Sequence, residues 1–412
     1  MIEDKNPKFF YGYIIVLASF LIHMVMLGVF FTYGIFFKPI STEFGWSRAM
    51  ISGAHALCEV VLGVLAIVAG RLTDRFGPRM VIVACACFLS MGYLLMSQIN
   101  TGWHLYLLFG VIVGIGMSGC LVPMTSTIAR WFVKRRGMMT GIILSGSSVG
   151  SMIMPPLARW LISTYGWRTS YIIMGIIALV FIIAAAQLLR RDPGKMGLLP
   201  DGETEVKAES LDLQAGGFSL SQTIHARQFW MICIILLCSA FCSFTVMIHI
   251  VLHATGLGIS VANAVNILVI IGGVSLAGTV IVGSIADRIG YKPAYTICLI
   301  ANSVAFLGLV VAEEAWILYP FAVIFGLGYG GARAVMSPLV AQLFGLGSLG
   351  TILGGLHFSA TIGAAIGPLL AGRIFDITNS YQPAWLICGT LMVVCVIITL
   401  LLKPSHEKGG EK

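Results

Sequence analysis

The sequence predicts an all-α membrane protein with twelve transmembrane helices in two pseudo-symmetric six-helix bundles. This prediction rests on the apolar composition, the length of the apolar runs and an internal repeat. Of the 412 residues, 58% are hydrophobic and 10% are charged, and the mean hydropathy is +0.96. Soluble proteins carry about 25% charged residues. The composition therefore excludes a soluble enzyme, a secreted disulfide scaffold and a nucleic-acid-binding protein.

Twelve apolar runs are long enough to cross a bilayer, which takes about 20 residues in a helix. Because the runs are continuous, they indicate helices and not the alternating strands of a membrane β-barrel. The expected spans are residues 11–38, 48–70, 80–99, 104–130, 137–162, 169–189, 227–254, 261–284, 294–312, 316–343, 349–375 and 383–402.

An even number of spans places both termini on one side of the membrane, and the distribution of Lys and Arg indicates which side. With cytoplasmic termini, nineteen of the 25 Lys and Arg residues face the cytoplasm and five face the other side. We expect a multi-pass protein of the plasma membrane, or of the inner membrane in a bacterium. This topology accounts for the net charge of +8 without a nucleic-acid partner.

The two halves of the chain repeat at an offset of 213 residues. Residues 70–79, after the second span, recur as residues 283–292 after the eighth span. The glycine pattern that begins at Gly137 in the fifth span recurs from Gly350 in the eleventh. The repeat predicts an N-terminal six-helix bundle, an acidic cytoplasmic linker with a short amphipathic turn at 218–224, and a C-terminal bundle with a short cytoplasmic tail. Their expected bounds are 1–189, 190–226 and 227–412.

The repeated loop and the paired bundles resemble the major facilitator superfamily over essentially the whole chain. Residues 130–150 resemble the passage from span 4 into span 5 of the monocarboxylate transporter family. Residues 10–48 are similar to that family and to its oxalate/formate exchanger relatives. The resemblance implies the major facilitator fold, alternating access and transport of small carboxylates, often with a proton. These relatives commonly carry an arginine where this chain has Thr279, so their usual carboxylate site cannot be carried over.

The repeated loops contain the candidate gating residues. We expect their aspartates to cap helix ends, because an aspartate adds little to membrane orientation. We expect their arginines to pair with neighbouring spans and hold one face shut. The alternative is that the arginines only fix the topology. The candidates are Asp74, Arg75 and Arg79 in the first loop, and Asp287 and Arg288 in the second.

Ionisable residues within the spans are costly and therefore suggest function. Counted from the cytoplasmic ends, His23, Glu59, Arg333 and His357 lie at similar depths, about 12 to 18 Å at 1.5 Å per residue. Arg333 is the main candidate for binding a carboxylate, because its guanidinium stays charged and offers paired donors. The alternative is a structural ion pair with Glu59.

The other candidates have similar alternatives. Glu59 and His55 share one face of the second span, and with His23 they are candidates for proton coupling. The alternative for Glu59 is a packed, protonated side chain without a role in transport. The alternative for the histidines is that they only form hydrogen bonds between helices. Aromatic candidates can instead belong to the core, and serines can serve close helix packing. The further candidate substrate contacts are Tyr329, His357, Phe358, Ser118 and Ser145.

The predicted function is secondary active transport of small organic anions, with a proton-coupled monocarboxylate carrier preferred. Anion exchange, efflux of a bulkier amphiphile and sensing without transport remain alternatives. The sequence has no H-E-x-x-H motif, and residues 146–150, which fit the pattern G-x-S-x-G, lie inside an expected span and not at a strand-to-helix turn, so no enzyme is expected. The ten cysteines lie in spans without metal-ligand spacing, so neither metal nor cofactor is expected. The expected partners are a small organic anion, a proton and the lipid bilayer, and a monomer is the working expectation.

Overall fold

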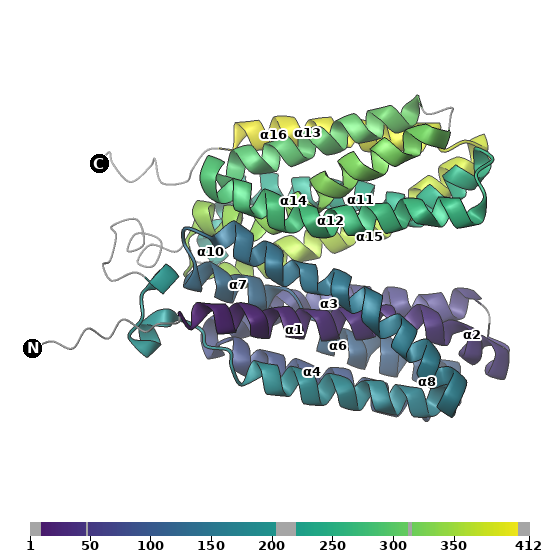
Figure 1. The fold of residues 1–412 in the computed structure, drawn as a ribbon, viewed down its shortest axis with the longest axis horizontal. Coiled ribbons are helices and arrows are strands. Elements are labelled where there is room, and N and C mark those ends of the chain that lie inside the picture. The colour runs from purple at the N-terminus through teal and green to yellow at the C-terminus, as the bar shows by residue number, and fades with distance from the viewer. Residues whose placement is uncertain (1–9, 47, 203–219, 312–314, 403–412) are drawn as a thin grey trace, which may run out of the picture.

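The computed structural model describes residues 10–46, 48–202, 220–311 and 315–402, which are almost entirely helical. Figure 1 shows two groups of long helices lying side by side. Within the described part, 11 helices are long and apolar enough to cross a membrane. One of them, α8, contains two of the expected spans. The twelve predicted spans are therefore present.

The N-terminal bundle contains the first six spans. Span 1 is divided into two helices and span 4 into four segments. Spans 5 and 6 are two helices that meet at Gly166, where the backbone is not helical and φ is 76°, and the label α8 covers both. A positive φ of this kind favours glycine. The elements are α1 (Gly12–Phe31), α2 (Tyr33–Phe44), α3 (Arg48–Phe76), α4 (Pro78–Met96), α5 (Gly102–Leu105), the π-helix η1 (Tyr106–Val113), α6 (Gly114–Met117), α7 (Val122–Trp131) and α8 (Arg136–Ala186).

The C-terminal bundle contains six long helices, one for each expected span. The described part of the linker holds two short 3₁₀ helices and one short α-helix, α10, which overlaps the turn expected at 218–224. The acidic stretch expected after residue 202 lies outside the described residues. The elements are η2 (Pro193–Met196), η3 (Pro200–Gly202), α10 (Leu220–His225), α11 (Arg227–Gly256), α12 (Val261–Ile289), α13 (Tyr291–Val310), η4 (Ala315–Ile317), α14 (Leu318–Phe344), α15 (Leu349–Thr378) and α16 (Gln382–Leu401).

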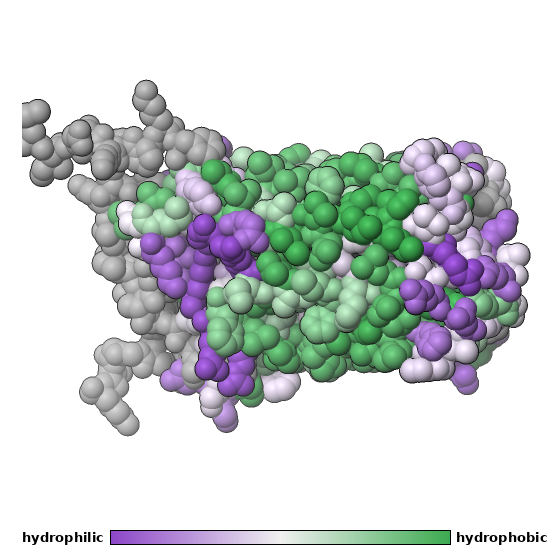
Figure 2. Space-filling view, turned by 90° about the horizontal axis from the view of Figure 1, so that it is seen from below, coloured by the Kyte–Doolittle hydropathy of each residue, from purple (hydrophilic) through white to green (hydrophobic). Residues whose placement is uncertain are grey.

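Each bundle has its own hydrophobic core. One core consists of buried residues between Ile15 and Leu189. The other runs from Phe229 to Leu402 and also includes Ala66, Val122 and Ala129 of the N-terminal bundle. Around these cores the surface itself is apolar, and Figure 2 shows a broad hydrophobic belt between two polar bands. Such a belt is what a bilayer-embedded surface requires.

The two bundles pack most closely through α3 against α15 and α8 against α12. Glycines permit this approach. A Cβ on Gly70 would overlap the Gly350 carbonyl oxygen, and a Cβ on Gly283 would lie 2.5 Å from the Gly137 carbonyl oxygen. We call the end of the molecule that carries η2, η3 and α10 the linker end. The bundles meet at this end and diverge toward the opposite end (Figure 1).

Two breaks in the helices were not predicted from the sequence. Span 1 is interrupted at Thr32, whose hydroxyl donates to the Val29 carbonyl at 2.6 Å. Span 4 leaves the helical path at residues 118–121, just before a helix that carries Pro123 in its first turn. Proline has no N–H to donate to a preceding turn. The second break frees backbone carbonyl groups near the middle of the bundle.

Candidate functional site

Two aspartates join the bundles at the linker end. Asp74 of α3 accepts hydrogen bonds from the backbone N–H groups of Gly350 at 3.2 Å and Thr351 at 2.9 Å, in the first turn of α15. Asp287 of α12 accepts from the N–H groups of Gly137 at 2.7 Å and Met138 at 2.9 Å, in the first turn of α8. Each carboxylate satisfies donors at a helix start in the other bundle. We call these two contacts the reciprocal caps.

Arg130 of α7 strengthens one of the two caps. Its guanidinium lies 3.3 Å from the Asp74 carboxylate and donates to the Leu346 carbonyl of the other bundle at 2.6 Å. It also lies 3.6 Å from Asp192 of the linker. Arg130 is one of the nineteen basic residues expected on the cytoplasmic side, and no contact between the bundles was predicted for it. No local pattern marked it, because its partners are distant in sequence.

The predicted gating arginines do not bridge the bundles. Arg79 donates to the side chain of Gln187, within the N-terminal bundle. Arg75 lies over the ring of Phe76, with 5.1 Å from its guanidinium carbon to the ring centre. Arg288 is exposed, and no ion pair or hydrogen bond joins it to another described residue. The aspartates of the repeated loops therefore make the contacts between bundles.

We expect Asp74→Asn to open the linker end more than Asp287→Asn does. The Asp74 carboxylate holds the charged Arg130 in addition to two N–H groups, and a hydrogen bond to a charged group contributes about 1.5 to 3 kcal/mol. The ratio of closed to open molecules should fall about 10- to 100-fold. Spin labels at Met80 and Gln342, one in each bundle, would report this as a longer distance. The labels require a Cys87→Ser background, because the other nine cysteines are buried. Equal distances in both variants would contradict the expectation.

A second group of predicted residues meets between the bundles, away from the linker end. His23 of α1 is 1% exposed, and its Nδ1 lies 3.2 Å from the Cys120 carbonyl at the break in span 4. Its Nε2 has no hydrogen-bond partner among the described residues. The positive charge of Arg333 in α14 acts on the imidazoles of His23 and of His357 in α15. Arg333 therefore lies close to groups of both bundles.

Arg333 has no acidic partner in the part of the chain that the structure describes. Its guanidinium lies over the Tyr329 ring, 5.4 Å from the ring centre, and it is partly exposed. Glu59 of α3 and Arg333 both act electrostatically on the Cys120 thiol, yet no ion pair within 4.0 Å joins them. Glu59 lies fifteen residues before Asp74, about 22 Å along the helix. The group is thus far from the reciprocal caps.

The remaining candidates lie at the edges of this group or outside it. The His55 ring packs on Phe30 at 4.9 Å and Tyr33 at 5.4 Å, inside the N-terminal bundle. His55 and Glu59 are not joined by a hydrogen bond. Phe358 is partly exposed and follows His357 on α15.

The hydroxyl groups of the two candidate serines donate hydrogen bonds to backbone carbonyl groups of the preceding turn. Ser118 donates to the Ile115 carbonyl at 2.7 Å and contacts the Cys85 thiol of α4. Ser145 donates to the Ile142 carbonyl at 2.6 Å. It lies one turn beyond Gly141, whose added Cβ would meet Thr279 of α12, so it continues the α8 face toward the other bundle. Of the two, Ser145 is the better placed to reach the space between the bundles.

The arrangement combines two helical bundles, contacts that close one end, and a partly exposed cation between the bundles. This is the architecture of a membrane transporter whose site lies between two halves. Within the described residues, no group of three or more His, Cys, Asp or Glu side chains is placed to hold a metal ion.

Comparison with known proteins agrees with this class. The sequence profile of the Major Facilitator Superfamily matches residues 19–312 and 267–412. The chain belongs to this superfamily. It is 25% identical to human monocarboxylate transporter 12, over 96% of this chain and 81% of the relative. Rat monocarboxylate transporter 13 is also 25% identical, over 97% and 91%.

A solved structure shows the same fold. The major facilitator transporter FucP, solved in the outward conformation, aligns with a TM-score of 0.74 at 13% identity, over 95% of this chain and 99% of that one. The protein is therefore a multi-pass major facilitator transporter of a small molecule, related to monocarboxylate transporters.

Proposed function

We propose that this protein is a secondary active transporter of small organic anions, and specifically a proton-coupled monocarboxylate carrier that works by alternating access. The observation that carries the proposal is Arg333, a partly exposed cation between the bundles that has no acidic partner among the described residues. A guanidinium binds a carboxylate through two parallel hydrogen bonds. Relatives named monocarboxylate transporters support the same substrate class.

The geometry supports a site that both bundles share. His23 belongs to the N-terminal bundle, and Arg333 and His357 belong to the C-terminal bundle, so an anion held by all three contacts both halves. Because Nδ1 of His23 faces the Cys120 carbonyl, which can only accept, Nε2 of the neutral ring is a hydrogen-bond acceptor and suits a hydroxyl group of the substrate. The partly exposed Tyr329 and Phe358 are the residues we assign to the apolar part of the substrate.

We propose that the linker end faces the cytoplasm of a plasma membrane, or of a bacterial inner membrane. The excess of Lys and Arg at that end supports this orientation. The reciprocal caps then hold the cytoplasmic face shut, and the structure corresponds to an outward-open state. Residues 1–189 and 227–412 would be the two moving units, joined by residues 190–226.

A thermal-shift panel on the purified protein tests the substrate class. Lactate, pyruvate and longer monocarboxylates should raise the melting temperature, whereas dicarboxylates should raise it less and lipophilic cations should have no effect. Uptake of the best monocarboxylate into proteoliposomes then tests transport. Stabilisation by the cations alone would refute the proposed substrate class and favour efflux of an amphiphile.

Glu59 is the group that we propose carries the coupled proton. It is the acidic residue expected well inside a span, it acts electrostatically on the same Cys120 thiol as Arg333, and no ion pair or hydrogen bond joins it to another described residue. We expect Glu59→Gln to abolish the stimulation of uptake by an inwardly directed proton gradient, while substrate exchange at equal pH continues. Uptake at matched and opposed pH measures this. Glu43→Gln is the control, because Glu43 is exposed and pairs with Arg168 away from the site. An unchanged response to the gradient in Glu59→Gln would exclude the proton role.

A further inference from the structure

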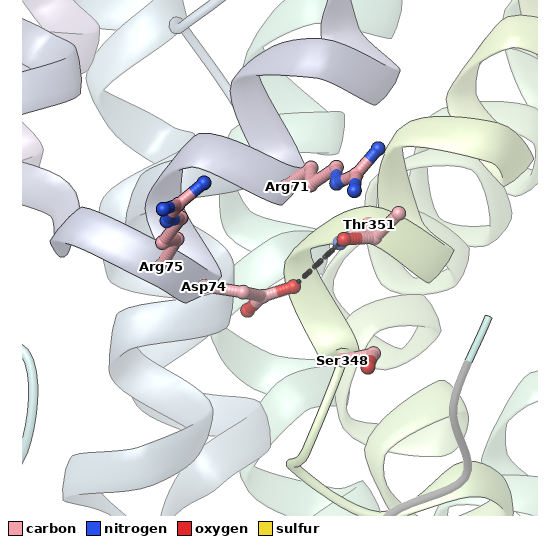
Figure 3. A pocket seen from close by; sticks show the side chains of 5 residues that line it. All are labelled: Arg71, Asp74, Arg75, Ser348 and Thr351. Carbon is pink, nitrogen blue, oxygen red and sulfur yellow. Dashed lines mark hydrogen bonds between the residues drawn. The ribbon is translucent and has the colours of Figure 1, made fainter.

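A pocket of about 450 Å³ lies at the linker end between the two bundles. Figure 3 shows its lining, with Arg71, Asp74 and Arg75 on α3 and Ser348 and Thr351 at the start of α15. Thr351 donates its hydroxyl to Asp74 at 3.0 Å. The pocket therefore adjoins one of the reciprocal caps.

The two arginines of this pocket leave a positive charge uncompensated. The Asp74 carboxylate is already occupied by Arg130 and by donors of α15. Arg71 and Arg75 are exposed, and neither forms an ion pair or hydrogen bond with another described residue. In Figure 3 both guanidinium groups turn away from the Asp74 carboxylate. Like charges at positions i and i+4 of a helix repel each other, so a bridging anion would relieve the repulsion.

We propose that this pocket binds a phosphate group, presented as a free phosphate or as the headgroup of an anionic lipid. Arginine pairs bind phosphate oxygens through several charged hydrogen bonds. The Ser348 hydroxyl, which caps no backbone N–H of α15, supplies a further donor. The volume exceeds what a phosphate ion alone needs, so an attached group fits. Basic pockets between transmembrane helices at this level are suited to lipid headgroups.

Phosphate binding would favour one conformation of the transporter. Arg71 and Arg75 belong to the N-terminal bundle and Ser348 to the C-terminal bundle, so the complete pocket exists only while α3 and α15 are in contact. A ligand shifts an equilibrium toward the state that it binds more tightly. Phosphate would thus keep the linker end closed. This consequence rests on the proposed alternating access, whereas the binding itself does not.

The second copy of the repeat provides a natural comparison. At the same offset of 213 residues, Ser284 stands in place of Arg71 and Arg288 in place of Arg75. Met138 replaces Thr351, and the arginine at the position of Ser348, Arg135, already donates to the Tyr13 hydroxyl at 3.1 Å. The Asp287 cap therefore lacks the arginine pair on α12. We expect no phosphate site there.

Binding is tested on the full-length protein in a neutral detergent. Sodium phosphate should raise the melting temperature relative to sodium chloride at equal ionic strength. The double variant Arg71→Gln, Arg75→Gln should weaken the apparent affinity for phosphate at least tenfold, whereas Arg288→Gln should leave it unchanged. Ser348→Ala, a smaller change, should weaken it by a few-fold and serves if the double variant does not fold. Equal stabilisation by phosphate in wild type and double variant, or none by phosphate or by anionic lipid, would overturn the proposal.

Two further experiments identify the source of the bound phosphate group and the effect of its binding on the conformation. Nanodiscs of phosphatidylcholine with or without phosphatidic acid replace the detergent. Stabilisation that phosphatidic acid gives and inorganic phosphate does not assigns the pocket to a lipid headgroup. Spin labels at Met80 and Gln342 then report the conformation, and bound phosphate should increase the short-distance population. Arginine-dependent binding with an unchanged distance distribution would retain the site and refute the conformational consequence.

Discussion

Arg333→Gln is expected to reduce the affinity for the transported anion about 10- to 100-fold and to remove saturable uptake at low substrate concentration. The glutamine keeps polar atoms but loses the charge and the paired donors, and a hydrogen bond to a charged group contributes about 1.5 to 3 kcal/mol. Arg333→Lys keeps the charge and should retain part of the uptake. Uptake into proteoliposomes and thermal shift on the purified variants measure transport and binding separately.

The matched control for this prediction is Arg159→Gln. Arg159 is an exposed arginine of α8 that is remote in sequence from every residue of the Arg333 group. The Arg159→Gln variant loses the same positive charge as Arg333→Gln, and its rate of substrate uptake should equal that of the wild type. If Arg333→Gln keeps wild-type affinity, the guanidinium has a structural role, and the proposed substrate site has to be abandoned.

Gly70→Ala should give the second large effect, a loss of the closed linker end and at least a tenfold fall in transport. The added Cβ overlaps the Gly350 backbone carbonyl, which belongs to a helix and cannot rotate away as a flexible side chain would. Overpacking of this kind costs about 1 to 3 kcal/mol. In the proposed alternating-access cycle this contact is lost when the linker end opens, so we expect the cost to fall on the closed state. Distances between spin labels at Met80 and Gln342 should lengthen.

Gly308→Ala is the control for the glycine prediction. Gly308 lies within α13, and an added Cβ there meets no atom within 4 Å. The same chemical change should leave both the label distance and the transport rate unaltered. An unaltered distance in Gly70→Ala would show that the helices separate slightly at no cost, and the close approach of α3 and α15 would then not limit closure.

Much of the fold was predictable because its causes are local or periodic. Long apolar runs predict spans, and the constant offset predicts two bundles. The breaks at Thr32 and at residues 118–121 were not predicted, because the length and mean hydropathy of each run are sufficient for an unbroken span. The expected gap between spans 5 and 6, residues 163–168, contains Gly166, where the backbone leaves the helical conformation.

The contacts of the candidate site were predictable only in part. The position of Arg333, Glu59 and the histidines inside apolar spans identified each of them as a candidate, but it did not predict their contacts. The partners of Asp74 and Asp287 are backbone N–H groups, which every non-proline residue carries, so side-chain chemistry did not reveal them. The repeat did contain a signal, because Gly137 and Gly350 are related by the same offset as the two aspartates.

The reciprocal caps also constrain the order of assembly on the ribosome. In one cap the donor, the Gly137 N–H group, is synthesised first, and its acceptor Asp287 follows 150 residues later. In the other cap the acceptor Asp74 is synthesised first, and its donor, the Gly350 N–H group, follows 276 residues later. When the N-terminal half enters the bilayer, the Gly137 N–H group and the Asp74 carboxylate therefore still lack their hydrogen-bond partners from the C-terminal half. Each half completes the other, so a chain that stalls before residue 350 cannot form both contacts.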